Sequence, residues 1–300
     1  MTVTTTSVQT RDLTAEQTPD HSVQTRDLTA VQTPDLTGVK HRQQAMWASG
    51  DFSVVAARIA LISEQLADSA DIRAGSRVLD VATGSGNAAI AAGRSGASVL
   101  GVDYVPALLE HARLRVAGEG LDVEFTEGDA ENLPVPDHSF DTVLSVVGTM
   151  FAPDHARTAA EMVRVCRPGG TIALASWTPE GFIGEMFRTI AAHVPPPAGV
   201  RSPLLWGTAA HLRELFGDAI RKIRSVERTC TFRHPSPEAF VGFFRRWYGP
   251  TLKAFEALNQ AGQRALATDL TILARRSDRY QDGGSIALPA AYLETVIRLR

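Results

Sequence analysis

Cysteine is scarce in this chain, which has only Cys166 and Cys230 among its 300 residues. Two cysteines provide neither a disulfide framework nor the ligand spacing of a structural zinc site. The eight histidines are dispersed, and no two of them stand at helical ligand spacing beside an acidic residue. We therefore predict no bound metal, and the lack of a disulfide framework indicates a reducing, cytoplasmic location.

Long apolar runs and an excess of basic charge are also lacking. No segment approaches the roughly 18 consecutive apolar residues that a membrane span requires. The N-terminus, MTVTTTSVQT, lacks the charged start and apolar core of a secretory signal. The formal net charge is -3, so no basic surface for nucleic acid is indicated. We predict a globular protein without a membrane span or a nucleic-acid partner, and the composition predicts no oligomeric state.

The N-terminal segment contains a tandem duplication. The sequence SVQTRDLTAEQTPD of residues 7–20 recurs 15 positions later, at residues 22–35, and differs only in having Val31 in place of Glu16. The segment is rich in Thr, Gln and Asp, and two copies are fewer than the roughly three that a stacked repeat architecture needs. We predict a flexible tail over residues 1–40 without a catalytic role; a short partner-binding or oligomerisation segment is the alternative.

The most informative segment is VLDVATGSGNAAIAAG, at residues 78–93. Its first residues are aliphatic and suit a buried parallel strand, and the Ala-rich part from Asn87 onward suits the start of a helix. Gly84 and Gly86 fall in the turn between them. A glycine turn lets a ligand approach the backbone, and the unpaired N–H groups of a helix start attract an anionic or polar group. The segment therefore predicts a nucleotide-binding loop.

The glycine loop alone leaves the nature of the nucleotide open. Gly84, Gly86 and Ala89 also fit the G-x-G-x-x-A form of the dinucleotide fingerprint. The next apolar segment, ASVLGVD at residues 97–103, predicts a second buried strand that ends in Asp103. A carboxylate at that place accepts hydrogen bonds from the ribose hydroxyls of a bound nucleotide. Its alternative role is to cap the helix that starts near Pro106.

Four segments together narrow the choice of the bound nucleotide. In chain order they read DVATGSG, VDYVPALLEHAR, EGDAENLPVPDHSFDTVLS and RVCRPGGTIALASW. Their order and spacing resemble the motifs of class I S-adenosylmethionine-dependent methyltransferases, and above all the ubiquinone/menaquinone-biosynthesis-like (methyltransferase type 11) enzymes that act on small molecules. The similarity covers residues 45–180. It implies methyl transfer from S-adenosylmethionine to a small-molecule acceptor; an NAD(P)-dependent oxidoreductase and a non-catalytic S-adenosylmethionine-binding regulator are the alternatives.

The resemblance implies which residues hold the methionine end of S-adenosylmethionine. They are Asp80, Ala82, Gly84, Gly86, Ser145 and Val146. Asp80, Ala82 and Gly84 would line this end of the cofactor, and Ser145 and Val146 would lie beside its amino group. One position departs from the family pattern, because the family commonly has a glycine where this chain has Ala82. The loop must therefore accommodate one extra methyl group.

The resemblance also implies the residues at the adenosine end. They are Asp103, Tyr104, Asp129 and Ala130. Asp103 would hold the ribose hydroxyls and gain charge-assisted hydrogen bonds. Tyr104 would flank the adenine or, alternatively, pack on the sheet edge. Asp129 would accept from the adenine amino group, and the Ala130 N–H would complete that edge, unless Asp129 is only a turn residue.

His155 is the candidate general base. Methyl transfer depends mainly on positioning, because the sulfonium is already an activated electrophile. A base helps where the acceptor is a hydroxyl or an acidic carbon, and His155 follows the fourth predicted strand, near the expected site. The alternative is that Asp154 caps a helix here and that His155 belongs to its first turn.

Strand and helix patterns alternate from Val78 to Trp177. They predict an α/β fold with a doubly wound, mostly parallel Rossmann-like sheet, and the resemblance implies seven strands. Further strands are predicted at residues 223–232 and 292–299, the last one antiparallel. We expect an S-adenosylmethionine-binding core at residues 41–180 with an N-terminal lid helix. Residues 181–300 would add the last strands and a helical substrate cap at residues 236–276.

Aromatic residues flank the predicted crevice on two sides. Trp47 and Phe52 precede an amphipathic helix predicted over residues 53–66, where they form a lid over the cofactor or pack against the core. The C-terminal part contributes Phe182, Phe187, Trp206, Phe240, Phe243, Phe244, Trp247 and Tyr248. These residues indicate either a helical core or a pocket for an aromatic or otherwise apolar acceptor.

Overall fold

The computed structural model describes Met1 and residues 35–300. The tandem repeat lies outside the described residues except for Asp35, the last residue of its second copy. Asp35 is the N-cap of helix α1 (Leu36–Trp47), and its carboxylate accepts a hydrogen bond of 3.0 Å from the Gly38 amide. The tail predicted over residues 1–40 therefore extends too far, because the chain is helical from Leu36 onward.

A seven-stranded sheet with the strand order β3-β2-β1-β4-β5-β7-β6 forms the centre of residues 35–300. Strand β7 pairs antiparallel with both β5 and β6, and all other neighbouring strands are parallel. The strands are β1 (Arg77–Val81), β2 (Ser98–Asp103), β3 (Val123–Glu127), β4 (Phe140–Val146), β5 (Cys166–Trp177), β6 (Ile220–His234) and β7 (Ile286–Leu299). The predicted mostly parallel α/β sheet is confirmed.

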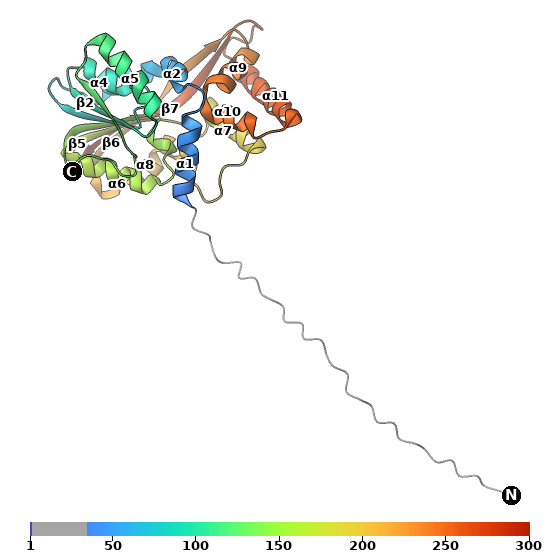
Figure 1. Ribbon diagram of the computed structural model, residues 1–300, viewed down its shortest axis with the longest axis horizontal. Helices are drawn as coiled ribbons and strands as arrows, with labels where there is room; N and C mark the ends of the chain where they lie inside the picture. The colour runs from blue at the N-terminus through green and yellow to red at the C-terminus, as the bar shows by residue number, and fades with distance from the viewer. Residues whose placement is uncertain (2–34) are drawn as a thin grey trace. The chain divides into compact units, whose positions relative to one another are not determined.

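Helices cover both faces of this sheet (Figure 1). One face carries α3 (Ala60–Ser69), α4 (Asn87–Arg94) and α5 (Pro106–Glu119), and the other carries α6 (His155–Val165) and α8 (Ala209–Phe216). Because β1 and β4 are covered on both sides, their residues are buried almost continuously along the strand rather than at every second position. This double burial explains why the central strands were predictable from hydrophobicity.

The direction of winding changes between β1 and β4. The chain passes from β1 to β2 and β3 on one side, then returns to place β4 and β5 on the other side. Ligands of open α/β sheets bind outside the carboxyl ends of the strands at such a switch point. The loops after β1, β2 and β4 therefore border the expected site.

Several elements differ in length from the predictions. The helix predicted over residues 53–66 consists of α2 (Phe52–Ala56), the short 3-10 helix η1 (Ala57–Ile59) and α3. Strands β6 and β7 are both longer than predicted, and they pair along nearly their whole length. Charged residues on the exposed face of β6 interrupt the apolar pattern by which a strand is recognised in a sequence.

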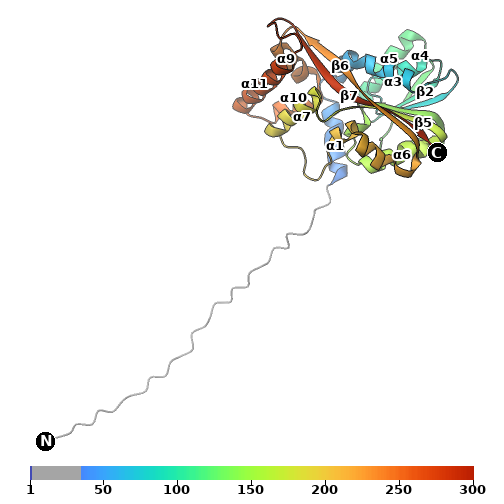
Figure 2. The same ribbon diagram turned by 180° about the vertical axis from the view of Figure 1, so that it is seen from behind.

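The long β6–β7 pair extends toward a group of helices at one end of the described residues (Figure 2). This group contains α7 (Phe182–His193), α9 (Pro237–Trp247), α10 (Gly249–Glu256) and α11 (Gln260–Ser277). Helix α1 packs against α10. Three further 3-10 helices are η2 (Thr149–Phe151), η3 (Pro203–Gly207) and η4 (Gly217–Ala219). The C-terminal helices and the N-terminal helix thus meet beside the sheet.

Among residues 35–300, no single helix combines the length and the apolar composition of a membrane span. The helical segments Leu36–Trp47 and Phe52–Ser69 together have that length and composition, but the chain bends by 75° between them.

Candidate active site

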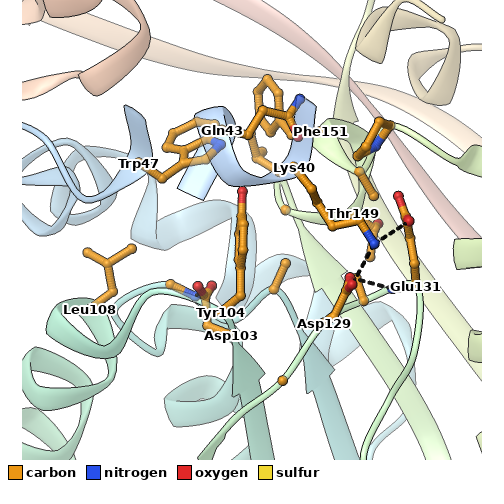
Figure 3. A pocket seen from close by; sticks show the side chains of 18 of the residues that line it. Lys40, Gln43, Trp47, Asp103, Tyr104, Leu108, Asp129, Glu131, Thr149 and Phe151 are labelled. Atoms are coloured by element: carbon orange, nitrogen blue, oxygen red, sulfur yellow. Dashed lines mark hydrogen bonds and ion pairs between the residues drawn. The ribbon is translucent and has the colours of Figure 1, made fainter. Parts of the chain in front are cut away.

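A cavity opens at the carboxyl ends of the strands, below helix α1 (Figure 3). It encloses about 670 Å³, including its open mouth, and we call it the polar cavity. Its lining includes the predicted residues Ala82, Gly84, Asp103, Tyr104, Asp129 and Ala130, together with Lys40, Trp47 and Glu131. The structure therefore brings together residues from the loops after β1, β2 and β3, as parallel strands require.

A second cavity of about 370 Å³ lies around the glycine loop, and we call it the loop cavity. Among its lining residues are the predicted Asp80 and Val146. Ala82 and Gly84 line both this cavity and the polar cavity, so the two adjoin along the loop. An elongated ligand can therefore lie across the glycine loop with one end in each cavity.

Asp80 has an unpaired oxygen in the interior. Its side chain is 1% exposed, and its Oδ2 accepts hydrogen bonds from the Thr83 hydroxyl at 2.5 Å and the Ala89 amide at 2.9 Å. Its Oδ1 has no partner among the described residues. Burial raises the pKa of the Asp80 carboxyl to about 7. A buried carboxylate oxygen without a partner is costly, so Oδ1 is suited to receive a donor from a ligand.

Asp103 organises the glycine loop. Its Oδ2 accepts a hydrogen bond of 2.8 Å from the Gly84 amide, and its Oδ1 accepts one of 2.9 Å from the Val105 amide. Burial raises the pKa of this carboxyl above its ordinary value. The Val105 contact forms a turn just before α5, whose N-cap is Val105 itself and which has no side-chain cap, so Asp103 does not cap this helix. Each carboxylate oxygen has a second lone pair, which leaves Asp103 able to accept from ligand hydroxyls.

A lysine from α1 reaches the polar cavity. Lys40 Nζ lies 2.5 Å from Asp129 Oδ2 and 2.6 Å from Glu131 Oε2, as Figure 3 shows. The Glu131 side chain is only 8% exposed, and its other oxygen accepts from the Asp154 amide at 2.8 Å. The two carboxylates raise the pKa of Lys40, although burial acts in the opposite direction. Asp129 is therefore more than a turn residue, because its carboxylate joins α1 to the sheet.

Sequence reasoning missed Lys40 and Glu131. Lys40 was assigned to the tail, and 89 positions separate it from Asp129. The same helix donates a second hydrogen bond, from Gln44 Nε2 to the Tyr104 carbonyl at 2.5 Å. No sequence pattern near Lys40 or Gln44 predicts that these side chains contact Asp129 and Tyr104. Tyr104 itself stands in the polar cavity between Trp47 and Asp129 (Figure 3).

Residue Val147 has a strained backbone. Its φ angle is 53°, in the left-handed region that a β-branched residue rarely adopts. Its amide donates to the Ala175 carbonyl at 2.7 Å, so pairing with β5 holds this conformation. The neighbouring Ser145 hydroxyl donates to the Val81 carbonyl and accepts from the Thr149 amide. Ser145 therefore links the end of β1 to the loop after β4, and it does not line the polar cavity or the loop cavity.

Two further predicted residues lie outside these cavities. Gly86 has φ 86° and is the N-cap of α4, where it shapes the loop. His155 is 2% exposed, and its Nδ1 lies 3.0 Å from Nε2 of His211. Burial lowers the pKa of His155 to about 4. Asp154 caps α6 by accepting from the Arg157 amide, so the structure places His155 in the first turn of a helix and not beside the cavities.

A third cavity, the aromatic chamber, lies between α2, the sheet and the C-terminal helices. The space between its lining residues, including the part open to solvent, is about 320 Å³. The lining residues are Phe52, Val55, Ile59, Val147, Phe151, Trp177, Ile183, Met186, Phe232, Phe244 and Tyr248. Phe52 and Val147 line this chamber, the polar cavity and the loop cavity. The three cavities therefore meet at these two side chains.

The chain is similar in sequence to known methyltransferases, as the arrangement of these cavities would suggest. A family model described as a methyltransferase domain matches residues 79–174. An uncharacterised protein of Mycobacterium tuberculosis is 39% identical over 243 residues, which cover 80% of this chain and 89% of that protein. A demethylmenaquinone methyltransferase of Thermus thermophilus is 34% identical over 164 residues, which cover 49% of this chain and 74% of that enzyme.

The chain belongs to the class I S-adenosylmethionine-dependent methyltransferases. A crystal structure of a putative methyltransferase from Bacillus halodurans has the same fold, with a TM-score of 0.55 and 21% identity over 79% of this chain and 97% of that one. As a member of this family, the protein is a methyltransferase with S-adenosylmethionine as its cofactor rather than a dinucleotide-dependent oxidoreductase. Among residues 35–300, no group of three or more His, Cys, Asp or Glu side chains is arranged to hold a metal ion.

Ala82 gives a first testable prediction for this methyltransferase. Its φ angle is 55°, in the left-handed region that glycine adopts more easily than alanine. We expect Ala82→Gly to stabilise the protein by about 0.5 kcal/mol, since relief of the left-handed strain slightly exceeds the added chain entropy of glycine. Urea unfolding measures the change. A loss of stability instead would show that the Ala82 methyl group contributes essential packing.

Proposed function

We propose that this methyltransferase transfers the methyl group of S-adenosylmethionine to a small apolar molecule held in the aromatic chamber. The observation that carries the proposal is the meeting of the three cavities at Phe52 and Val147. A cofactor that lies across the glycine loop, with one end in the polar cavity and the other in the loop cavity, presents its centre at this junction. The chamber begins on the other side of the same two side chains.

The contacts support one orientation of the cofactor. The adenosine belongs in the polar cavity, where Asp103 can accept from the ribose hydroxyls and Tyr104 borders the adenine. Asp129 and the Ala130 amide would then bind the adenine edge, with Lys40 holding the Asp129 carboxylate in place. The methionine end belongs in the loop cavity, where Asp80 Oδ1 can accept from its ammonium group.

The chemical step requires little from the protein beyond positioning. A lone pair of the acceptor forms a bond to the methyl carbon, and the electron pair of the carbon–sulfur bond returns to sulfur, which becomes neutral. The apolar lining of the chamber excludes water from this step. No carboxylate, imidazole, amine or thiol of residues 35–300 lines the chamber, so a proton released by the acceptor passes to water after transfer. His155 has no role in this proposal.

Two measurements test the proposal. Thermal unfolding with S-adenosylmethionine, S-adenosylhomocysteine and NADH comes first, because a ligand at about 100 times its dissociation constant stabilises by roughly 2.7 kcal/mol. We expect a shift with the two adenosyl ligands only. Methyl-labelled S-adenosylmethionine is then incubated with apolar, anionic and oligonucleotide acceptors. Cofactor binding without label transfer to any apolar acceptor, or transfer to oligonucleotides alone, contradicts the proposed acceptor class.

Asp80 makes cofactor binding depend on pH. Its folded pKa of about 7 exceeds the ordinary value of 3.8, so the cofactor-free protein binds a proton between these values and this group costs stability as the pH rises through them. The ammonium group of the cofactor favours the ionised form. We expect the affinity for S-adenosylmethionine to increase about tenfold from roughly pH 5.5 to pH 7.5.

Calorimetry across this pH range measures the affinity. Asp80→Asn removes the titrating group but keeps the shape of the side chain, so its affinity should be lower and vary little with pH. An equally steep pH profile in Asp80→Asn would assign the dependence to another group.

A further inference from the structure

Helix α2 connects the glycine loop to the C-terminal helices. At its start, the Asp51 amide donates a hydrogen bond of 3.1 Å to the carbonyl of Trp247, the last residue of α9. At its end, the Ala56 carbonyl accepts a hydrogen bond of 2.8 Å from Asn87 Nδ2. Asn87 is the first residue of α4 and follows the glycine loop directly. Because α2 has only five residues, these two hydrogen bonds fix both of its ends.

The Phe52 ring of α2 packs directly against the glycine loop. A methyl group on Gly84 would stand 3.6 Å from Phe52 Cε1, which is ordinary van der Waals contact. The ring also packs against those of Trp47 and Tyr248, with centroid distances of 5.5 and 6.3 Å. Phe52 lines all three cavities. The position of α2 therefore sets the shape of the junction between them.

Arg115 on α5 orients Asn87. Its Nη1 donates to the Ser85 carbonyl at 2.6 Å and to Asn87 Oδ1 at 2.8 Å. A guanidinium can only donate and the Ala56 carbonyl can only accept, so these two partners determine which end of the Asn87 amide faces each of them. One nitrogen of Arg115 thus holds both the glycine loop and the residue that connects this loop to α2.

We propose that Arg115 and Asn87 are positioning residues for methyl transfer, which hold Phe52 in place relative to the glycine loop when the cofactor is bound. This inference rests on the proposed function, because it takes the junction at Phe52 and Val147 as the place of transfer. Asn87 lines the loop cavity, whereas Arg115 lines none of the three cavities. A cofactor in the loop cavity therefore acts on α2 through the Asn87 amide. Such positioning matters because a misplacement of about 1 Å can reduce a rate roughly a hundredfold.

Fluorine NMR of the full chain tests this inference without the natural acceptor. 4-Fluorophenylalanine replaces Phe52 in one sample and Phe140 in another. Phe140 begins β4, at the end of the strand opposite to the cavities, so its label is the internal reference. We expect S-adenosylhomocysteine to shift and sharpen the resonance of the label at residue 52 and to leave that at residue 140 unchanged, because ordering of α2 removes exchange between positions.

Two variants remove the proposed connection at different points. Arg115→Met loses the donors to the Ser85 carbonyl and Asn87, and Asn87→Ala loses the donor to the Ala56 carbonyl. With saturating S-adenosylhomocysteine, we expect the resonance of the label at residue 52 to be broadened in both variants, because α2 then occupies more than one position. Asn87→Ala keeps the test decisive if Arg115→Met does not fold, and thermal unfolding establishes which variants are folded.

Arg113→Met is the matched control. Arg113 lies on the same helix as Arg115 but donates to Glu110 and to the Phe125 carbonyl, so it has no contact with Asn87 or α2. This variant should lose a comparable guanidinium and keep the sharp resonance of the label at residue 52.

The outcomes separate this inference from the proposed function. Broadening that occurs in Arg115→Met or Asn87→Ala and is confined to the label at residue 52 supports the positioning role. An unchanged resonance in the folded variants refutes it, and so does equal broadening at residue 140 or in Arg113→Met. The proposed function fails on a different observation, namely that no methyl label reaches an apolar acceptor, whatever the fluorine spectra show.

Discussion

Asp103→Ala is expected to weaken the binding of S-adenosylmethionine by roughly 1–3 kcal/mol, or about tenfold to a hundredfold. The first reason is the loss of the charge-assisted hydrogen bonds that we propose between Asp103 and the ribose hydroxyls. The second comes from the structure, because the Gly84 and Val105 amides lose their acceptor and the glycine loop is no longer held against β2. Two buried amides without partners should also lower the free energy of unfolding by about 2 kcal/mol.

Calorimetry gives the affinity and urea unfolding gives the stability. Asp141→Ala is a suitable control, because Asp141 also accepts from a backbone amide, that of Arg77 at 2.7 Å, but lies at the start of β4, away from the cavity. It should lose stability and keep its affinity for the cofactor. Unchanged affinity in Asp103→Ala would show that the ribose hydroxyls bind elsewhere.

Lys40→Met should lower the affinity for S-adenosylmethionine about tenfold and the free energy of unfolding by about 2 kcal/mol. Methionine keeps most of the side-chain volume but removes the charge that joins α1 to Asp129 and Glu131. Glu131 is then left as a mostly buried carboxylate without its ion pair, and Asp129 loses the group that holds its carboxylate at the polar cavity, where we propose that it binds the adenine. Partial exposure of Lys40 keeps the expected loss below that of a fully buried pair.

The experiment has a built-in probe and a matched control. Trp47 on the same helix lines the polar cavity, so the part of the tryptophan fluorescence that is lost in Trp47→Phe reports whether α1 stays in place. Lys253→Met removes a comparable ion pair, to Glu256 on α10, at an exposed position, and should change neither affinity nor fluorescence. An affinity for S-adenosylmethionine in Lys40→Met equal to that of the unaltered chain would mean that α1 does not contribute to the cofactor site.

The strands and the glycine loop were predictable because their signals are local. Residues 78–81 are buried on both faces of the sheet and must be apolar, apart from Asp80. Gly84 and Gly86 both have positive φ angles, which is why the turn carries glycine. The parallel topology then brings Asp103 and Asp129 to the same edge without further information. For His155, proximity in sequence to β4 says nothing about the face of α6 on which the ring lies, and the structure buries this ring beside His211.

The sequence by itself determined the fold class and the positions of the loops, because hydrophobic period and turn chemistry act over a few neighbouring residues. The cofactor was implied by the resemblance of four segments to a known family. Only the tertiary structure decided that Lys40 belongs to the cavity and that residues of α2, β5, β6 and α9 enclose one apolar chamber. Such contacts join residues far apart in the chain. They depend on how amphipathic helices and strands pack against each other, and a local sequence pattern does not indicate which element packs against which.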